Sequence, residues 1–169
     1  VKSVTHEDVT VEELGGADMH ASRSGVSDYA ADSGADAIDY VRKLISYLPQ
    51  NNVENPPIVP CNDPIERTSS NLNAIIPENP NEAYDMKEII LQSVDNGEFL
   101  EIKAQFAPNI IVGFARFNGM SVGVVANQPA HFSGVLDIDS SVKGARFVRF
   151  CDCFNIPVVT FVDVPGFLP

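Results

Sequence analysis

Two loops carry residue types that could bind a ligand, and each follows an apolar segment typical of a β-strand. Residues 158–162 run into Val164-Pro165-Gly166-Phe167, and a glycine at such a place can turn backbone N–H groups toward an oxyanion. Asn127 and Gln128 follow residues 120–126, and their amides could hydrogen-bond a ligand or cap loop backbone. Each pattern is also that of a plain turn, so both interpretations stay open.

Gly15 and Gly16 form a further glycine pair, directly after Thr10-Val11-Glu12-Glu13, whose spacing matches a capping box. They either end a short helix or let a ligand approach the backbone closely. The usual catalytic side chains form no known constellation, since the sequence lacks an HExxH motif, a serine elbow near a histidine, and a glycine-rich phosphate loop. Three cysteines, Cys61, Cys151 and Cys153, predict reduced thiols rather than disulfides or a zinc site. We expect no metal centre, and we expect any catalysis to rest on backbone donors.

The charge of the chain limits its partners. The 169 residues carry a formal net charge of -12, which argues against a nucleic-acid footprint or an anionic membrane surface. Lys143, Arg146 and Arg149 form a basic stripe on a predicted helix. This stripe is either a solvated or interface face, or a surface that attracts an anionic cofactor or an acidic partner subunit.

The cellular location follows from what the sequence lacks. It contains no apolar run of ~20 residues that could span a membrane and no apolar signal-peptide core. Together with the reduced thiols, this predicts a cytoplasmic protein without direct membrane insertion. Because the chain begins with Val1 rather than Met, we expect a processed or excised piece.

Three helices are predicted from apolar periodicity and capping residues. The first spans 35–48 and is amphipathic with one buried face, and the second starts at Asp85 and ends at Asn96-Gly97. The third starts at Asp139 or Ser140 and runs to about Phe154. Its inward side is expected to include Val142, Ala145, Val148 and Cys151.

Strands are predicted over residues 99–103, 109–117, 120–126 and 158–162. Asn118-Gly119 between the second and third is a strong signal for a type I′ turn, because both central residues need positive φ. A strand, a helix and another strand then follow the hairpin. This order predicts an α/β layer fold with one parallel strand pair.

Proline divides the chain, since seven of its 12 prolines lie in residues 49–80. Such a stretch can form neither a continuous helix nor a central strand. A loop of this length inside one compact domain is uncommon, so we predict a linker between two folding units. Residues 36–48 are accordingly expected to pack in a different core from residues 120–126.

Long blocks of the sequence carry a family resemblance in addition to these patterns. The blocks are VKSVTHEDVTVEELGGADMHASRSGVSDYAA, LPQNNVENPPIVP, YDMKEIILQSVDNGEFLEI, VGVVANQP and GVLDIDSSVKGARFVRFCDCFNIPVVTFVDVPGFLP. They closely resemble the carboxyltransferase subunit of biotin-dependent acyl-CoA carboxylases, as found in propionyl-CoA carboxylase (β subunit), methylmalonyl-CoA decarboxylase (α subunit) and transcarboxylase. The resemblance implies a crotonase (ClpP)-like ββα-spiral fold, with pieces of two such domains. Residues 1–50 would end the N-terminal acyl-CoA domain, 51–84 would be the proline-rich linker, and 85–169 would begin the C-terminal biotin-binding domain.

The family's reaction moves CO2 between N1′ of biotin and the α-carbon of an acyl-CoA, with backbone N–H pairs stabilising the oxyanions. The resemblance implies that the two principal glycine motifs lie before Val1 and after Pro169, so this chain alone is expected to be inactive. It implies Gly166 and Phe167 as candidates for a further donor in the biotin half. The implied substrate-binding residues are Gly15, Gly16, Ser24 and Gly25 near the acyl end of CoA, and Asn127 and Gln128 near the cleft.

The resemblance also implies partners. Biotin would be carried by another protein or domain, and a coenzyme A thioester would be the substrate. The partners would be biotin carboxylase and biotin carboxyl carrier subunits, or membrane decarboxylase subunits, around a ring-like homohexamer. The isolated piece is expected to be oligomeric or aggregation-prone, because strands cut from their neighbours recruit others.

Several functions stay open at this point. Within the family, the same blocks serve a carboxylase, a decarboxylase and a transcarboxylase. Outside it, the alternatives are a crotonase-class acyl-CoA hydratase or isomerase without biotin, and a non-catalytic assembly module. One fold can serve all of them, so fold alone does not decide.

Overall fold

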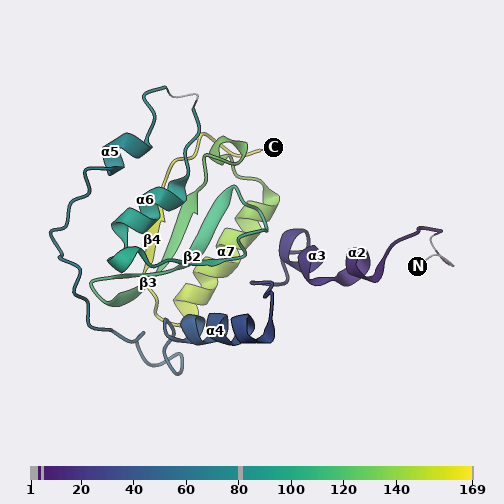
Figure 1. The fold of residues 1–169 in the computed structure, drawn as a ribbon, viewed down its shortest axis with the longest axis horizontal. Coiled ribbons are helices and arrows are strands. Elements are labelled where there is room, and N and C mark those ends of the chain that lie inside the picture. Colours follow the sequence, from purple (N-terminus) through teal and green to yellow (C-terminus); the bar gives the residue numbers. More distant parts are fainter. Residues whose placement is uncertain (1–3, 5, 80–81, 169) are drawn as a thin grey trace.

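The computed structural model describes residue 4, residues 6–79 and residues 82–168. Its centre is a four-stranded sheet in the order β1-β2-β3-β4 (Figure 1). β1 to β3 pair antiparallel and β3 pairs parallel with β4, which confirms the predicted parallel pair. The strands are Leu100–Ile102 (β1), Ile110–Phe117 (β2), Met120–Asn127 (β3) and Val158–Phe161 (β4).

The β2–β3 hairpin turns at Asn118 and Gly119, whose φ angles of 51° and 76° confirm the predicted positive-φ pair. The Asp95 carboxylate accepts hydrogen bonds from both turn N–H groups, at 2.9 Å from Asn118 and 2.7 Å from Gly119. Burial raises the pKa of Asp95, but these N–H donors, the Cys61 thiol and Arg67 together hold it below its ordinary value. The carboxylate therefore stays charged and fixes the turn.

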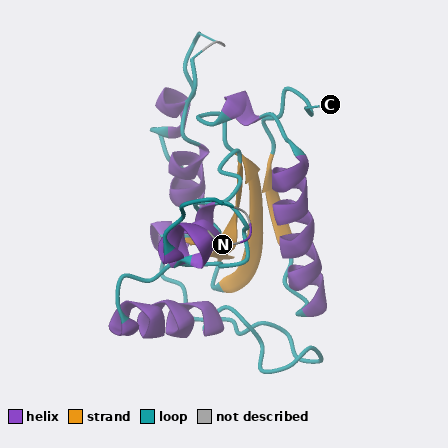
Figure 2. Cartoon of the chain, turned by 90° about the vertical axis from the view of Figure 1, so that its right-hand side faces the viewer, coloured by secondary structure: helices purple, strands orange, loops and turns teal. Residues whose placement is uncertain are grey.

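Helices cover both faces of the sheet (Figure 2). Helix α6 (Met86–Ser93) packs on one face and α7 (Ile138–Cys153) on the other. The remaining helices precede the sheet: α2 (Val11–Gly15), α3 (Ala17–Ser22), α4 (Gly34–Ile45) and α5 (Leu72–Ile75). Short 3₁₀ turns lie at Asp95–Gly97 and Phe132–Gly134. The predicted helix at Asp85 has its N-cap there, but it ends at Ser93, before the 3₁₀ turn.

Helix α7 begins earlier than predicted. Its N-cap is Asp137, which accepts from the Ser140 N–H at 2.9 Å while the Ser140 hydroxyl accepts from the Asp137 N–H at 2.7 Å. The capping box spans 137–140, so the predicted start at Asp139 or Ser140 is two to three residues late.

The buried side of α7 also differs from the prediction, except at Cys151. Val142 and Val148 are 48% and 43% exposed, Ala145 is exposed, and the buried residues are Ser140, Lys143, Gly144, Phe147 and Cys151. Glycines explain the choice of face. A Cβ on Gly123 of β3 would lie 2.5 Å from the Cys151 sulfur, and one on Gly144 would lie 3.1 Å from Ile110. Close backbone approach at these two glycines outweighs the side-chain hydrophobicity on which the prediction rested.

Helix α4 confirms the predicted helix but not its buried face. Only Tyr40 and Leu44 of this helix reach the core, whereas Ile38, Val41 and Ile45 stay exposed. The buried anchor is Tyr47, just after the helix, whose ring stacks on Phe114 with centroids 5.8 Å apart.

The two core clusters follow the two faces of the sheet. Tyr47 packs on the α7 face, and Val125 of β3 packs against the same cluster. Val122, Val124 and Ala126 face α6 in the other cluster. The expectation of separate cores for 36–48 and 120–126 is therefore wrong, because Val125 packs in the Tyr47 cluster. Val122, Val124 and Ala126 pack in the other cluster, because successive strand residues point to opposite faces.

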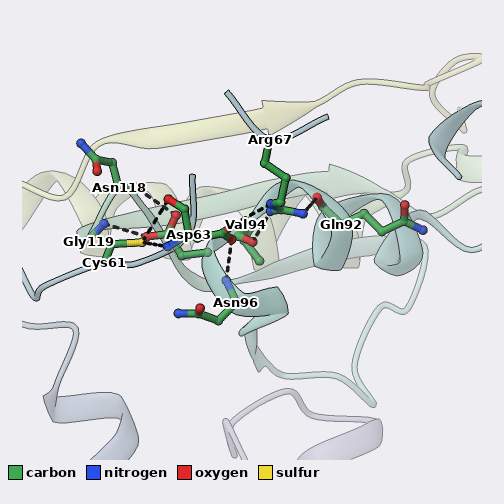
Figure 3. A network of polar contacts seen from close by, with 9 residues as sticks. Cys61, Asp63, Arg67, Gln92, Val94, Asn96, Asn118 and Gly119 are labelled. Atoms are coloured by element: carbon green, nitrogen blue, oxygen red, sulfur yellow. Dashed lines mark hydrogen bonds and ion pairs between the residues drawn. The ribbon is translucent and has the colours of Figure 1, made fainter. Parts of the chain in front are cut away.

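The proline-rich segment runs around the outside of the body, and residues 58–69, here called the strap, attach it to the sheet (Figure 1). Ile58 bridges to Met120, and the Val59 N–H donates to the Gly119 carbonyl at 3.0 Å. Figure 3 shows the polar network that follows. Arg67 donates to the carbonyls of Gln92 and Val94 at 2.8 and 3.0 Å and pairs with Asp63 at 2.8 Å. The strap thereby caps the C-terminal end of α6.

Replacing Arg67 with Met should lower the free energy of unfolding by about 1–3 kcal/mol, because two carbonyls at the end of α6 lose a charged donor. Urea unfolding measures this loss. Arg42→Met is the matched control, since Arg42 and Asp39 are 3.7 Å apart and both 78% exposed, so its loss should be near zero. Equal losses in the two variants would contradict the capping role of the strap.

Candidate functional site

Asn127 ties together the two loops that leave the carboxyl ends of β3 and β4. Its amide donates to the Gly134 carbonyl at 3.2 Å, and its side-chain oxygen accepts from the Asp163 N–H at 3.3 Å. Gly134 has a φ of 76°, and a Cβ there would lie 2.8 Å from the Asp163 carbonyl. The two loops therefore meet closely at the edge where ligands of α/β sheets usually bind.

Gln128 ties the same edge to α6. Its side-chain oxygen accepts from the Met86 N–H at 3.1 Å, and its amide donates to the Asp85 carboxylate at 2.6 Å. Asn127 and Gln128 are both buried, and their amides bind groups of this chain. This geometry favours the capping interpretation that the sequence left open.

The Gly166–Phe167 loop lies beside the start of α7. The Leu136 N–H donates to the Gly166 carbonyl at 3.1 Å, and the Leu168 N–H donates to the Leu136 carbonyl at 2.8 Å. Within the described ranges, the N–H groups of Gly166 and Phe167 have no acceptor. Phe167 is 72% exposed, and no atom lies within 4 Å of a Cβ built on Gly166, whose φ is not positive. Both N–H groups are thus free to bind a ligand.

A hollow of about 460 Å³ lies beside this loop. Tyr84 and Asp163 line it, and the Tyr84 hydroxyl donates to the Asp163 carboxylate at 2.6 Å. Burial and this hydrogen bond raise the pKa of Tyr84, so its phenol stays a neutral donor. Pro129, Ser133 and Pro165 also line the hollow, which places it at the carboxyl ends of β3 and β4.

The candidate residues of the acyl-CoA side lie elsewhere, on an N-terminal arm. Helices α2 and α3 project from the body (Figure 1). Gly15 ends α2, and Gly16 lies between the two helices. Gly16 is the N-cap of α3, and its own N–H donates to the Glu12 carbonyl at 2.8 Å. The capping box at Thr10 is confirmed. The structure therefore does not bring Gly15 and Gly16 to the hollow beside Gly166.

Ser24 and Gly25 end the arm where it meets the body. The Ser24 hydroxyl lies 2.9 Å from Nδ1 of His20. Gly25 has a φ of 61°, and a Cβ there would lie 2.7 Å from the Phe106 ring. Only glycine fits this contact, because any side chain would strain the backbone and strike the ring.

Lys143, Arg146 and Arg149 do not form the predicted basic stripe. Lys143 is 1% exposed, whereas both arginines are exposed, because the three positions span about 120° of the helix surface and Lys143 lies at the edge that is buried against the body. The Lys143 ammonium donates to the carbonyls of Phe106, Ala107 and Ile110 at 2.7, 3.2 and 2.8 Å. The ammonium therefore binds the loop before β2 and is not available to an anionic ligand.

Sequence reasoning missed several residues of this edge. Asp163 directly follows the apolar segment 158–162, and that position could have identified it. Tyr84 and Gly134 had no local signal, since each acts through a contact with a distant loop. Among residues 4, 6–79 and 82–168, no cluster of three or more His, Cys, Asp or Glu could hold a metal ion, and no helix is long and apolar enough to cross a membrane.

The layered sheet and its open edge define a crotonase-like carboxyltransferase fold. The structure matches transcarboxylase 12S, solved as a hexamer with methylmalonyl-coenzyme A and methylmalonic acid bound, with a TM-score of 0.95 and 49% identity. The match covers 99% of this chain and 32% of that chain, and it confirms the fold class that the sequence predicted.

All residues from 1 to 169 match the family model described as "Carboxyl transferase domain", so the chain belongs to this family. It is 57% identical to the mitochondrial propionyl-CoA carboxylase beta chain of Sus scrofa, covering 100% of this chain and 31% of the relative. It is 53% identical to the methylmalonyl-CoA decarboxylase subunit alpha of Veillonella parvula, covering 100% and 33%. The chain thus spans about a third of the length of these curated relatives.

The buried Lys143 makes a pH-dependent contribution to stability. Burial lowers its pKa from 10.5 to about 8, although Glu101 raises it. Between these two pH values the unfolded chain keeps a proton that the native protein has lost. Stability from this group is therefore present above pH 10.5 and is lost as the pH falls through about 8.

Comparison with Lys143→Met isolates this contribution. Between pH 8 and pH 10.5, the unfolding free energy of the wild type minus that of Lys143→Met should rise by roughly 3 kcal/mol. Denaturant unfolding at several pH values measures it, and Lys43→Met, which removes an exposed lysine of α4, controls for other titrating groups. A difference that stays constant with pH would contradict a depressed pKa.

Proposed function

We propose that this chain is part of the carboxyltransferase subunit of a biotin-dependent acyl-CoA carboxylase. That subunit transfers CO2 between carboxybiotin and the α-carbon of an acyl-CoA, with propionyl-CoA and methylmalonyl-CoA as substrate and product or the reverse. Support comes from matches that cover all of this chain, and about a third of the length of propionyl-CoA carboxylase and methylmalonyl-CoA decarboxylase subunits. These relatives favour carboxyl transfer over a biotin-free hydratase or isomerase.

The division of the chain is part of this proposal. Residues 1–50 belong to the end of the acyl-CoA domain, 51–84 form the linker, and 85–169 begin the biotin-binding domain. The strap supports this division, because it runs outside the sheet and joins it through the hairpin and the end of α6. Gly15, Gly16, Ser24 and Gly25 then serve the acyl-CoA side.

The observation that carries the mechanism is the pair of backbone N–H groups at Gly166 and Phe167 without an acceptor in the described chain. Carboxyl transfer builds negative charge on the thioester oxygen and on the ureido oxygen, and fixed N–H donors stabilise such charge best. Biotin, when bound, carries the carboxyl group. These two N–H groups suit its ureido oxygen, and they need no side chain to act.

Asn127 and Gln128 act in this mechanism by holding the loops around the donor N–H groups in place. Asn127 holds the Asp163 loop against Gly134, and Gln128 holds the same edge to α6. The Tyr84–Asp163 hydrogen bond closes one side of the hollow. Their role is to keep the donor loop rigid, because preorganised donors need no rearrangement as charge develops.

The partners follow the same proposal. The subunit assembles as a homo-oligomer, as the hexameric transcarboxylase 12S does, and works with a biotin carboxylase and a biotin carboxyl carrier or with membrane decarboxylase subunits. Three free thiols, at Cys61, Cys151 and Cys153, fit a reducing compartment such as the cytoplasm.

Carboxylation assays test the proposed function directly. The full-length subunit, supplied with biotin carboxylase, carrier, ATP and labelled bicarbonate, should carboxylate propionyl-CoA. The 169-residue chain under the same conditions should show no turnover above buffer, since the principal donor motifs are expected outside it. A full-length subunit without carboxyltransferase activity would refute the proposal, and an active short chain would refute the placement of the main donors.

The donor loop has its own test in the full-length subunit. Gly166→Pro removes the N–H at this position and should lower kcat by ~10²–10³ with little change in the acyl-CoA KM. Gly166→Ala is the matched control: it keeps the N–H, its φ is not positive, and its Cβ meets no atom within 4 Å, so kcat should hardly change. Equal small losses would mean a plain turn, and large losses in both variants with lower melting temperatures would mean a structural role.

A further inference from the structure

One lysine joins the N-terminal arm to the sheet. The Lys103 ammonium pairs with the Asp28 carboxylate at 2.7 Å and donates to the carbonyl of Gly25. It also lies 3.4 Å from each of the carbonyls of Val26 and Ser27. Three backbone carbonyls and a carboxylate thus converge on one cation that is only 7% exposed. Without the cation these oxygens would lose their shared donor, so Lys103 helps to hold residues 25–28 together.

The loop that carries Lys103 is itself held in an uncommon conformation. Lys103 and Ala107 have φ angles of 55° and 43°, which cost free energy in residues other than glycine. Lys143 of α7 offsets this cost by donating to the carbonyls of Phe106, Ala107 and Ile110. Lys143 thus fixes the 103–107 loop to α7, and Lys103 of that loop fixes the arm.

Two further contacts fix where the arm lies. The Lys103 N–H donates to the Asp28 carbonyl at 2.9 Å, so main chain as well as side chain ties the two segments. The Phe106 ring lies against the backbone of Gly25, where a Cβ would come within 2.7 Å of it. The arm is therefore seated by charge, by backbone pairing and by shape at the same place.

We propose that Lys103 is a positioning residue of the acyl-CoA site, which holds Ser24 and Gly25 at a fixed place against the end of β1. This inference rests on the proposed function, which assigns Ser24 and Gly25 to the acyl-CoA side. Lys103 does not touch the substrate in this role, because its donors are used by the arm. It acts on the place of residues 24–28 relative to the sheet.

The test compares Lys103→Met with Lys87→Met in the full-length subunit together with its partner subunits. Lys87 of α6 pairs with Glu101 of β1 at 2.7 Å, so the control removes an ion pair of the same length that does not involve the arm. Lys103→Met should raise the acyl-CoA KM by ~10-fold with kcat almost unchanged, as expected when one charge-assisted anchor of a binding segment is lost. Lys87→Met should leave both constants near the wild type.

Hydrogen exchange supplies a readout that does not depend on activity. Backbone amides of residues 24–28 should exchange faster in Lys103→Met than in the wild type or in Lys87→Met. Asp28→Asn is the second variant, because it removes the charge partner of Lys103 without changing Ser24 or Gly25, and it should raise KM in the same direction if Lys103→Met does not fold.

The outcomes separate the inference from the proposed function. An inactive wild-type subunit overturns the proposed function, while the exchange of residues 24–28 still reports whether Lys103 seats the arm. An active wild type with unchanged KM and unchanged exchange in Lys103→Met overturns the inference. So does a loss of kcat and melting temperature with KM unchanged, which would make Lys103 only a stability element.

Discussion

The parallel pairing of β4 with β3 is the constraint on which the rest of the structure depends. Gly123 to Ala126 pair in register with Val158 to Phe161, so the loops after both strands leave at the same edge. A parallel pair needs a crossover, and α7 supplies it. The crossover packs closely because Gly123 and Gly144 have no Cβ where Cys151, Phe147 and Ile110 must fit. A side chain at Gly123 would push α7 outward and separate the two loops that form the candidate site.

Polar side chains in this protein are used mainly to hold backbone in place. Asn127 and Gln128 join loops at the open edge, Arg67 caps α6, and Lys103 and Lys143 gather carbonyls. Buried polar groups need partners, and each of these has several. Among the described residues of the edge, the backbone N–H groups of Gly166 and Phe167 are left without an acceptor. Side chains that hold the backbone rigid suit a reaction in which backbone N–H groups stabilise the negative charge.

The arm and the strap show how segments outside a core can be attached to it. Each segment lies outside the sheet and is fixed by a cation that binds several carbonyls, Lys103 for the arm and Arg67 for the strap. Such anchors place a segment precisely in space while burying little apolar area. They also make its position sensitive to single substitutions, because one side chain binds several carbonyls at once.

Local patterns determined much of this protein. The strands, the positive-φ turn at Asn118-Gly119, the caps at Thr10 and Asp85, and the parallel pair all follow from propensity and periodicity, which act over a few neighbouring residues. The matching blocks identified the family, and the edge at Asn127 and Gly166 was located from strand order.

Tertiary structure alone decided which face of α7 is buried, because Gly123 and Gly144 matter only once the helix meets the sheet. It also decided that Lys143 is buried among carbonyls, that Val125 shares a core with Tyr47, and that Lys103 seats the arm. Those contacts join residues far apart in sequence, and no local pattern records which distant backbone a side chain will meet.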